Sequence, residues 1–136
     1  MTTKVNFDQY SQFVDAVTSD ESKDFLALSQ RMVELDQNGA NIERLMTGAI
    51  GLSAESGEIL EIVKKMLFQG KPYNEDNREH LKRELGDVMW YVVQLLLALG
   101  YTMEEIIETN VDKLSKRFPN GQFEVFYSEN REVDDL

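Results

Sequence analysis

The sequence contains no cysteine, and it has only 14 lysines and arginines against 25 aspartates and glutamates. The absence of cysteine excludes disulfide bonds and cysteine-ligated zinc sites. The formal charge of −11 argues against binding to the phosphate backbone of a nucleic acid, which requires clustered basic side chains. It does not exclude small phosphorylated ligands, which an acidic protein can bind through divalent metal ions and a few cations.

Long apolar segments are also missing from the chain. The longest, residues 88–99, is interrupted by Gln94 and is too short to span a bilayer. The N-terminus lacks the apolar stretch of a signal peptide, so we expect an intracellular, cytoplasmic protein without a membrane partner. With 136 residues, 42% of them hydrophobic, the chain is large enough for one domain with a real core.

Apolar residues recur at helical spacing along most of the chain, which predicts an all-α fold. We expect about five helices, over residues 6–17, 22–37, 41–69, 78–100 and 102–118. The loop at 70–77, rich in Gly, Pro and Asn, joins the third and fourth into an antiparallel helical hairpin at the centre of a helical bundle. Beyond Val88 the fourth helix is apolar on nearly all sides, so we expect oligomerisation to complete the bundle.

The domain organisation expected from these patterns is simple. Residues 1–121 form a single all-α domain, in which Ile107, Val111 and Leu114 of the fifth helix face the core. Residues 122–136 form a C-terminal extension that consists of an apolar, aromatic segment and a mobile acidic tail. We interpret the aromatic segment as packing or edge structure.

Three glycines, Gly48, Gly51 and Gly57, lie within the third predicted helix. Glycine inside a helix costs roughly 1 kcal/mol relative to alanine, so three in one helix indicate close packing or the approach of a ligand. Close contact with a neighbouring helix would explain them.

Two short acidic segments lie on either side of the hairpin loop, Glu55-Ser-Gly-Glu58 and Glu84-Leu-Gly-Asp87. Each places two carboxylates at positions i and i+3, and therefore on one face of a helix. In the expected hairpin, Glu58 lies about 16 Å and Asp87 about 15 Å from the loop, at a rise of 1.5 Å per residue. The four carboxylates of Glu55, Glu58, Glu84 and Asp87 should therefore converge at one level.

Four converging carboxylates raise one another's pKa, so we expect a cation among them. Oxygen ligands without thiolate or imidazole suit Mg²⁺ or Mn²⁺ rather than zinc. The alternative is a solvated helix face, but both acidic pairs lie where burial begins, which favours the metal site. A ferritin-like di-iron site requires Glu-x-x-His pairs, and the single histidine, His80, has no acid three residues before it. We interpret His80 as a surface residue.

A polar and cationic line, Asn110, Lys113 and Arg117, follows one face of the fifth predicted helix. Their spacing alone would indicate a charged helix face that is exposed to solvent. If the ligand is a polyphosphate, however, these cations would neutralise the oxygen atoms that an acid-bound metal does not reach.

Three segments, taken in this order, resemble the MazG-like branch of the all-α nucleoside triphosphate pyrophosphohydrolases, in its short, single-domain, phage-type form. They are Gly51-Leu-Ser-Ala-Glu-Ser-Gly-Glu58, Glu84-Leu-Gly-Asp-Val-Met-Trp-Tyr91 and Asn110-Val-Asp-Lys-Leu-Ser-Lys-Arg-Phe-Pro-Asn-Gly121. The resemblance covers about residues 41–121. It implies an all-α homodimer or homotetramer that cleaves a nucleoside or deoxynucleoside triphosphate between the α and β phosphates, which releases the monophosphate and pyrophosphate.

The resemblance also assigns roles to individual residues. It implies that Glu55, Glu58, Glu84 and Asp87 bind Mg²⁺ and that one of them is the catalytic base. It places substrate phosphates near Lys65, Asn110, Lys113 and Arg117. If a phage encodes the protein, its compartment is the host cytoplasm.

Two alternatives to this function remain open at the level of sequence. One is a pyrophosphatase of the same fold that is specific for dUTP, dCTP or phosphoribosyl-ATP. The other is a non-catalytic helical oligomer that binds nucleotides or partners.

Overall fold

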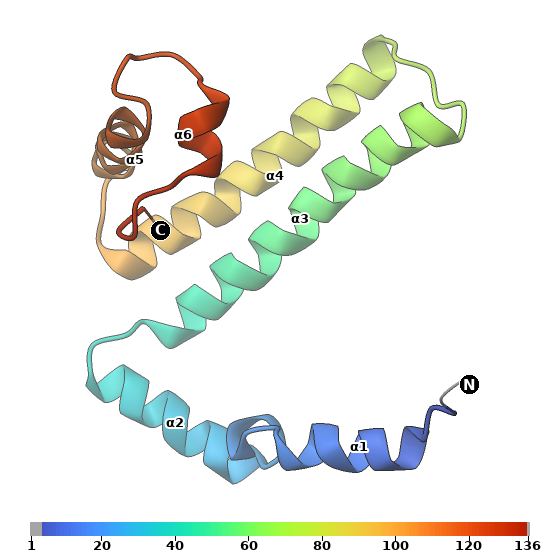
Figure 1. The fold of residues 1–136 in the computed structure, drawn as a ribbon, viewed down its shortest axis with the longest axis vertical. Helices are drawn as coiled ribbons and strands as arrows, with labels where there is room; N and C mark the ends of the chain where they lie inside the picture. The colour runs from blue at the N-terminus through green and yellow to red at the C-terminus, as the bar shows by residue number, and fades with distance from the viewer. Residues whose placement is uncertain (1–3, 136) are drawn as a thin grey trace. The chain divides into compact units, whose positions relative to one another are not determined.

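The computed structural model describes residues 4–135, and within this range every regular element is a helix (Figure 1). The elements in chain order are α1 (Phe7–Ala16), the short 3₁₀ helix η1 (Asp20–Ser22), α2 (Phe25–Gln37), α3 (Ile42–Phe68), α4 (Glu75–Leu99), α5 (Met103–Arg117) and α6 (Val125–Glu129). The predicted all-α fold is confirmed. The sequence patterns did not predict α6, which lies in the segment that we interpreted as packing or edge structure.

The chain divides into two compact units, Met1–Glu43 and Arg44–Leu136. In the first unit, side-chain caps fix where α1 and α2 begin. The Asn6 side chain accepts a hydrogen bond from the Gln9 amide at 3.1 Å, and Asp24 accepts one from the Ala27 amide at 2.9 Å. These bonds satisfy amide groups that have no partner within a helix.

The second unit is organised around α3 and α4, which lie side by side and antiparallel (Figure 1). Their connection is short because Gly70 adopts a left-handed conformation, φ +70°, just after α3. Asn74 caps α4 by accepting a hydrogen bond from the Asn77 amide at 3.0 Å, and the Asn77 side chain donates to the Pro72 carbonyl at 2.6 Å. Because of this cap, α4 begins at Glu75, a few residues before the predicted position.

The two helices approach each other closely at two glycines of α3. Gly48 and Gly51 are both buried. A Cβ atom on Gly48 would lie 2.7 Å from the Leu95 side chain, and one on Gly51 would overlap the Tyr91 ring. The packing explanation for these glycines is confirmed. At Gly57, by contrast, a Cβ atom would meet no described atom within 4 Å.

The single chain buries few apolar side chains. Among the described residues, Ile62 of α3 is the one buried large hydrophobic residue, at 5% exposure. The expectation that Ile107, Val111 and Leu114 of α5 face a core is wrong for the single chain, in which they are 54%, 54% and 38% exposed. The reason is geometric, because a pair of helices buries only the strip along which they touch.

The capacity of the helices to cross a membrane is limited. Over residues 4–135, none of the helices alone is long and apolar enough to do so. By length and composition alone, α4 and α5 taken together could cross a membrane, and the chain bends by 94° at the break between them.

Candidate active site

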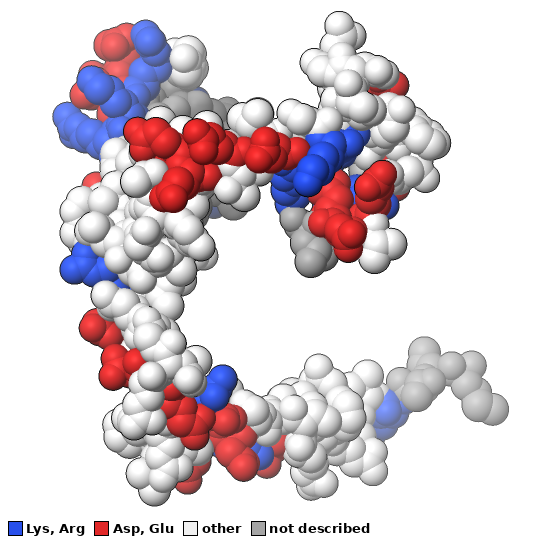
Figure 2. Space-filling view, turned by 90° about the vertical axis from the view of Figure 1, so that its left-hand side faces the viewer, with Lys and Arg blue, Asp and Glu red and all other residues white. Residues whose placement is uncertain are grey.

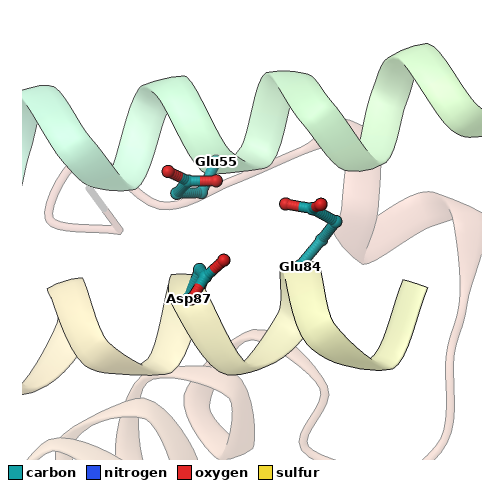
Figure 3. A group of neighbouring side chains, drawn as sticks. All are labelled: Glu55, Glu84 and Asp87. Carbon is teal, nitrogen blue, oxygen red and sulfur yellow. The ribbon is translucent and has the colours of Figure 1, made fainter. Parts of the chain in front are cut away.

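Three of the predicted acidic residues converge between α3 and α4. Glu55 projects from α3 toward Glu84 and Asp87 on α4 (Figure 3). Each offers one carboxylate oxygen, and these oxygens all lie within 4.8 Å of one another. We call these three residues the acid group.

The local sequence explains how the acid group forms. Glu84 and Asp87 share one face of α4 because they are three residues apart. Glu55 follows Gly51, and Tyr91 follows Asp87, by one helical turn each. The close contact between Gly51 and the Tyr91 ring therefore brings the two helices together one turn away from the carboxylates.

The Glu55 carboxyl is partly removed from solvent and faces other acidic side chains. Its pKa is raised above the ordinary value, first by desolvation and then by the charges of Asp87 and Glu84, by a hydrogen bond with the Glu84 carboxyl and by the charge of Glu58. The donor set consists of oxygens alone, as Mg²⁺ and Mn²⁺ prefer. Oxygens on opposite sides of one Mg²⁺ lie about 4.2 Å apart, which fits the observed spacing. The acid group is therefore suited to a hard divalent cation.

Glu58, the fourth predicted acid, lies outside the acid group. It is exposed and sits three residues beyond Glu55, nearer to the hairpin loop. Its rotation of about 60° from Glu55 equals the offset between Glu84 and Asp87, but its carboxylate oxygens are not among those that lie within 4.8 Å of one another. Its charge still contributes to the raised pKa of Glu55.

His80 has a role that the sequence interpretation missed. It is exposed, as expected, but its Nε2 atom lies 3.0 Å from Oε1 of Glu84, one turn along α4. The Glu84 side chain is only 15% exposed, so this contact holds a partly buried member of the acid group. The i to i+4 spacing of His80 and Glu84 was the sequence signal that could have revealed it.

Lys65 is engaged elsewhere on α3. Its Nζ atom lies 2.9 Å from Oε1 of Glu61, and this contact lowers the pKa of Glu61. The structure thus gives Lys65 a carboxylate partner that is not a member of the acid group.

The predicted cations of α5 surround a carboxylate from the C-terminal extension. Asp135 accepts hydrogen bonds from Nε and Nη2 of Arg117 at 2.5 and 2.6 Å, and its Oδ1 lies 4.0 Å from Nζ of Lys113. The Arg117 guanidinium keeps the pKa of Asp135 below its ordinary value. Asn110, the third residue of the predicted line, is exposed and does not contribute to the pocket that Lys113 and Arg117 line.

Basic side chains occur in small groups bordered by acidic ones on the face shown in Figure 2. This pattern agrees with the net charge of −11. It provides local sites for an anion and does not provide the continuous basic surface that a nucleic acid requires.

The fold and the acid group together define an all-helical protein with a cluster of three carboxylates between two antiparallel helices. The model of the MazG nucleotide pyrophosphohydrolase domain matches residues 45–122, which is more than half of the chain. The chain therefore belongs to this family, whose members are generally metal-dependent. The resemblance inferred from the three sequence segments is confirmed.

A phage protein is among the relatives of this chain. The Gene 37 protein of Mycobacterium phage L5 is 40% identical over 82 residues, which cover 60% of this chain and 72% of that protein. No solved structure matches the chain. The region matched by the family model contains the acid group and the cations of α5, and it ends before α6 and Asp135.

Proposed function

We propose that this protein is a Mg²⁺-dependent nucleoside or deoxynucleoside triphosphate pyrophosphohydrolase, which can also use Mn²⁺. The observation that carries the proposal is the convergence of Glu55, Glu84 and Asp87 in a chain of the MazG family. The reaction is attack of water on the α phosphorus and cleavage of the bond between that phosphorus and the α–β bridging oxygen. The products are the nucleoside monophosphate and pyrophosphate.

The carboxylates of Glu55, Glu84 and Asp87 hold the metal ion. When bound, Mg²⁺ polarises phosphate oxygens and lowers the pKa of water. Its charge also offsets the repulsion that raises the pKa of Glu55 in the protein alone.

Glu58 is the proposed acceptor of the proton from the attacking water. It borders the acid group without being part of it, so its carboxylate oxygens remain available to orient a water molecule. Glu58→Gln should abolish turnover and preserve stabilisation by Mg²⁺, since the acid group stays complete. Full activity in that variant would contradict the assignment.

The cations of α5 act on the phosphates. Lys113 and Arg117 offset the negative charge on the leaving pyrophosphate, and Asn110 donates hydrogen bonds from the same helix. Lys65 contacts the substrate more weakly, because it must leave Glu61 to do so.

A second copy of this chain completes the proposed structure as a homodimer or homotetramer. The support is the exposure of apolar side chains in the single chain, such as Trp90 at 55% and Leu97 at 59%. Sedimentation equilibrium measures this directly. A monomer at the concentrations used for the activity assay would overturn the assembly.

Hydrolysis in ¹⁸O-labelled water tests the proposed bond cleavage. Attack at the α phosphorus places the label in the monophosphate, whereas attack at the β phosphorus places it in pyrophosphate. Release of orthophosphate would show that the bond between the β and γ phosphates is cleaved instead. The same assay across dUTP, dCTP and phosphoribosyl-ATP separates a general enzyme from the specialised alternatives.

A further inference from the structure

The C-terminal segment places a carboxylate directly on the cations of α5. Both oxygens of Asp135 are used, since Oδ2 accepts from Nε of Arg117 and Oδ1 accepts from Nη2. A guanidinium binds a phosphate group with the same two-pronged geometry. The Arg117 and Asp135 side chains are 14% and 11% exposed, so the ion pair is shielded from water on most sides.

This ion pair lies in a pocket of about 990 Å³ between α5 and the segment that follows it. One wall carries Lys113, Lys116 and Arg117 of α5, and the other includes Phe126 and Asn130. The family model ends at residue 122, so the wall that contains Asp135 comes from beyond the domain shared with the family. Asp135 therefore lies outside the matched domain, whereas the cations that it contacts, Lys113 and Arg117, lie within it.

Asp135 occupies the Nε/Nη2 edge of Arg117, and one guanidinium edge accommodates one two-oxygen partner at a time, so a substrate phosphate that uses this edge must replace Asp135. We propose that Asp135 is an internal competitor of the substrate, and that a bound polyphosphate displaces it from Arg117 and Lys113. This inference rests on the proposed function insofar as that function assigns phosphate binding to these two cations.

The segment that carries Asp135 is built in a way that allows displacement. After α6 ends at Glu129, the chain reaches Asp135 through a turn in which the Asp135 amide donates to the Glu132 carbonyl at 3.0 Å. The apolar side chain of Val133 is 95% exposed and does not anchor the segment. Residues 131–135 contact α5 through the ion pairs of Asp135 with Arg117 and Lys113, and a competing anion acts directly on these ion pairs.

The strength of the competition follows from the fraction of molecules in which Asp135 is released. A released fraction of about one tenth to one fifth raises the apparent dissociation constant of the ligand about five- to tenfold. Removing the Asp135 charge should lower the apparent dissociation constant by the same factor.

Binding of inorganic tripolyphosphate to the full chain tests the proposal. The measurement is made by calorimetry in the presence of a chelator, so that metal ions on the acid group do not contribute. Asp135→Asn should bind tripolyphosphate about five- to tenfold more tightly than the wild type. The matched control is Asp134→Asn, which removes the same charge from the neighbouring residue of the pocket and should stay within about twofold of the wild type.

Several results would overturn the proposal. They are unchanged or weaker binding by Asp135→Asn, equal tightening in both variants, and no binding of tripolyphosphate to any of the three proteins. Circular dichroism verifies that each variant is folded. Asp135→Ala provides a second test with the same expectation if the asparagine variant fails to fold.

Kinetics distinguish this inference from the proposed function. With a nucleoside triphosphate and Mg²⁺, Asp135→Asn should lower KM by the same factor and leave kcat unchanged. If no nucleoside triphosphate yields pyrophosphate, the proposed function fails, and the tripolyphosphate comparison still decides whether Asp135 competes for the cations.

Discussion

The acid group and the Arg117–Asp135 pair are two charged regions of one compact unit with opposite electrostatic organisation. In the acid group, like charges converge, and the pKa of Glu55 rises because its carboxylate is desolvated and faces other acids. At α5, opposite charges are already matched, and the pKa of Asp135 falls because Arg117 stabilises its ionised form. The first region is suited to a cation from solution, whereas in the second a bound anion would compete with an internal partner for Arg117.

This difference has a direct consequence for ligand binding. Mg²⁺ should stabilise the fold, because it relieves repulsion that exists in the protein alone. An anion at α5 should stabilise it less, because the new contacts replace an existing ion pair. The predictions below test each side of this comparison, from the largest expected effect to the smallest.

The largest effect is expected from Glu55→Gln. This change removes one of three converging carboxylates, so turnover should fall by about a thousandfold or more and stabilisation by Mg²⁺ should disappear. Initial rates and melting curves with and without Mg²⁺ measure both effects. Glu79→Gln is the control, since Glu79 lies on α4 and pairs with Lys82 outside the acid group. Comparable losses in both variants would contradict the assignment.

Gly51→Ala should disturb the acid group indirectly. The added Cβ atom would overlap the Tyr91 ring and force α3 and α4 apart, which should destabilise the fold by about 1–3 kcal/mol. Displacement of the carboxylates by about 1 Å should lower turnover on the order of a hundredfold. Chemical denaturation and initial rates measure these effects.

The matched control for Gly51→Ala is Gly57→Ala on the same helix. A Cβ atom at Gly57 meets no described atom within 4 Å, so alanine should stabilise the chain by about 0.5–1 kcal/mol through its helix propensity. Destabilisation of the same size in both variants would show that the contact with Tyr91 is not what requires glycine at position 51.

His80→Ala should weaken the binding of Mg²⁺ about three- to tenfold, which is less than the roughly 10- to 100-fold loss typical of residues that orient metal ligands. The effect is modest because the His80 side chain is 47% exposed. Titration with Mg²⁺, followed by thermal stability, measures it. His80→Gln should restore part of the affinity, since glutamine at the same position can donate a hydrogen bond to Glu84. An alanine variant with wild-type affinity would show that the contact is incidental.

The smallest effect concerns pH and the Arg117–Asp135 pair. Because the pKa of Asp135 is lowered in the folded state, its contribution to stability is present above the ordinary value of 3.8 and is lost as the pH falls through the lowered pKa. Wild type should therefore melt at a higher temperature than Asp135→Asn near neutral pH. The difference should shrink as the solution is acidified below about pH 3. A constant difference across this range would contradict the ion pair.

The sequence predicted the features that depend on local helical geometry. The period of apolar residues predicted the helices, and the rise per residue placed Glu58 and Asp87 at matching distances from the hairpin loop. From this the four acids were expected to converge, and in the structure Glu55, Glu84 and Asp87 do so. The close packing at Gly48 and Gly51 was inferred from the cost of glycine in a helix. Each of these inferences uses a constraint that acts within a few residues or between two rigid helices.

The features that the sequence did not predict depend on side-chain direction or on distant parts of the chain. Glu58 was grouped with the other acids because its distance from the loop matches that of Asp87, but its carboxylate lies outside the acid group in the structure. The contact of Asp135 with Arg117 joins residues 18 positions apart through a loop and a short helix, and no periodic pattern encodes it. The exposure of Ile107 and Val111 escaped prediction because an apolar stripe indicates a buried face and does not identify the surface that covers it.

The most direct test of the central claim is pyrophosphate release from the eight common nucleoside and deoxynucleoside triphosphates and dUTP. Each is assayed with Mg²⁺, with Mn²⁺ and with chelator, in the wild type and in Glu55→Gln. The account predicts metal-dependent release of pyrophosphate from one or more of these substrates by the wild type and its loss in the variant. Release that persists in chelator or in Glu55→Gln would contradict the claim that the acid group is the catalytic metal site.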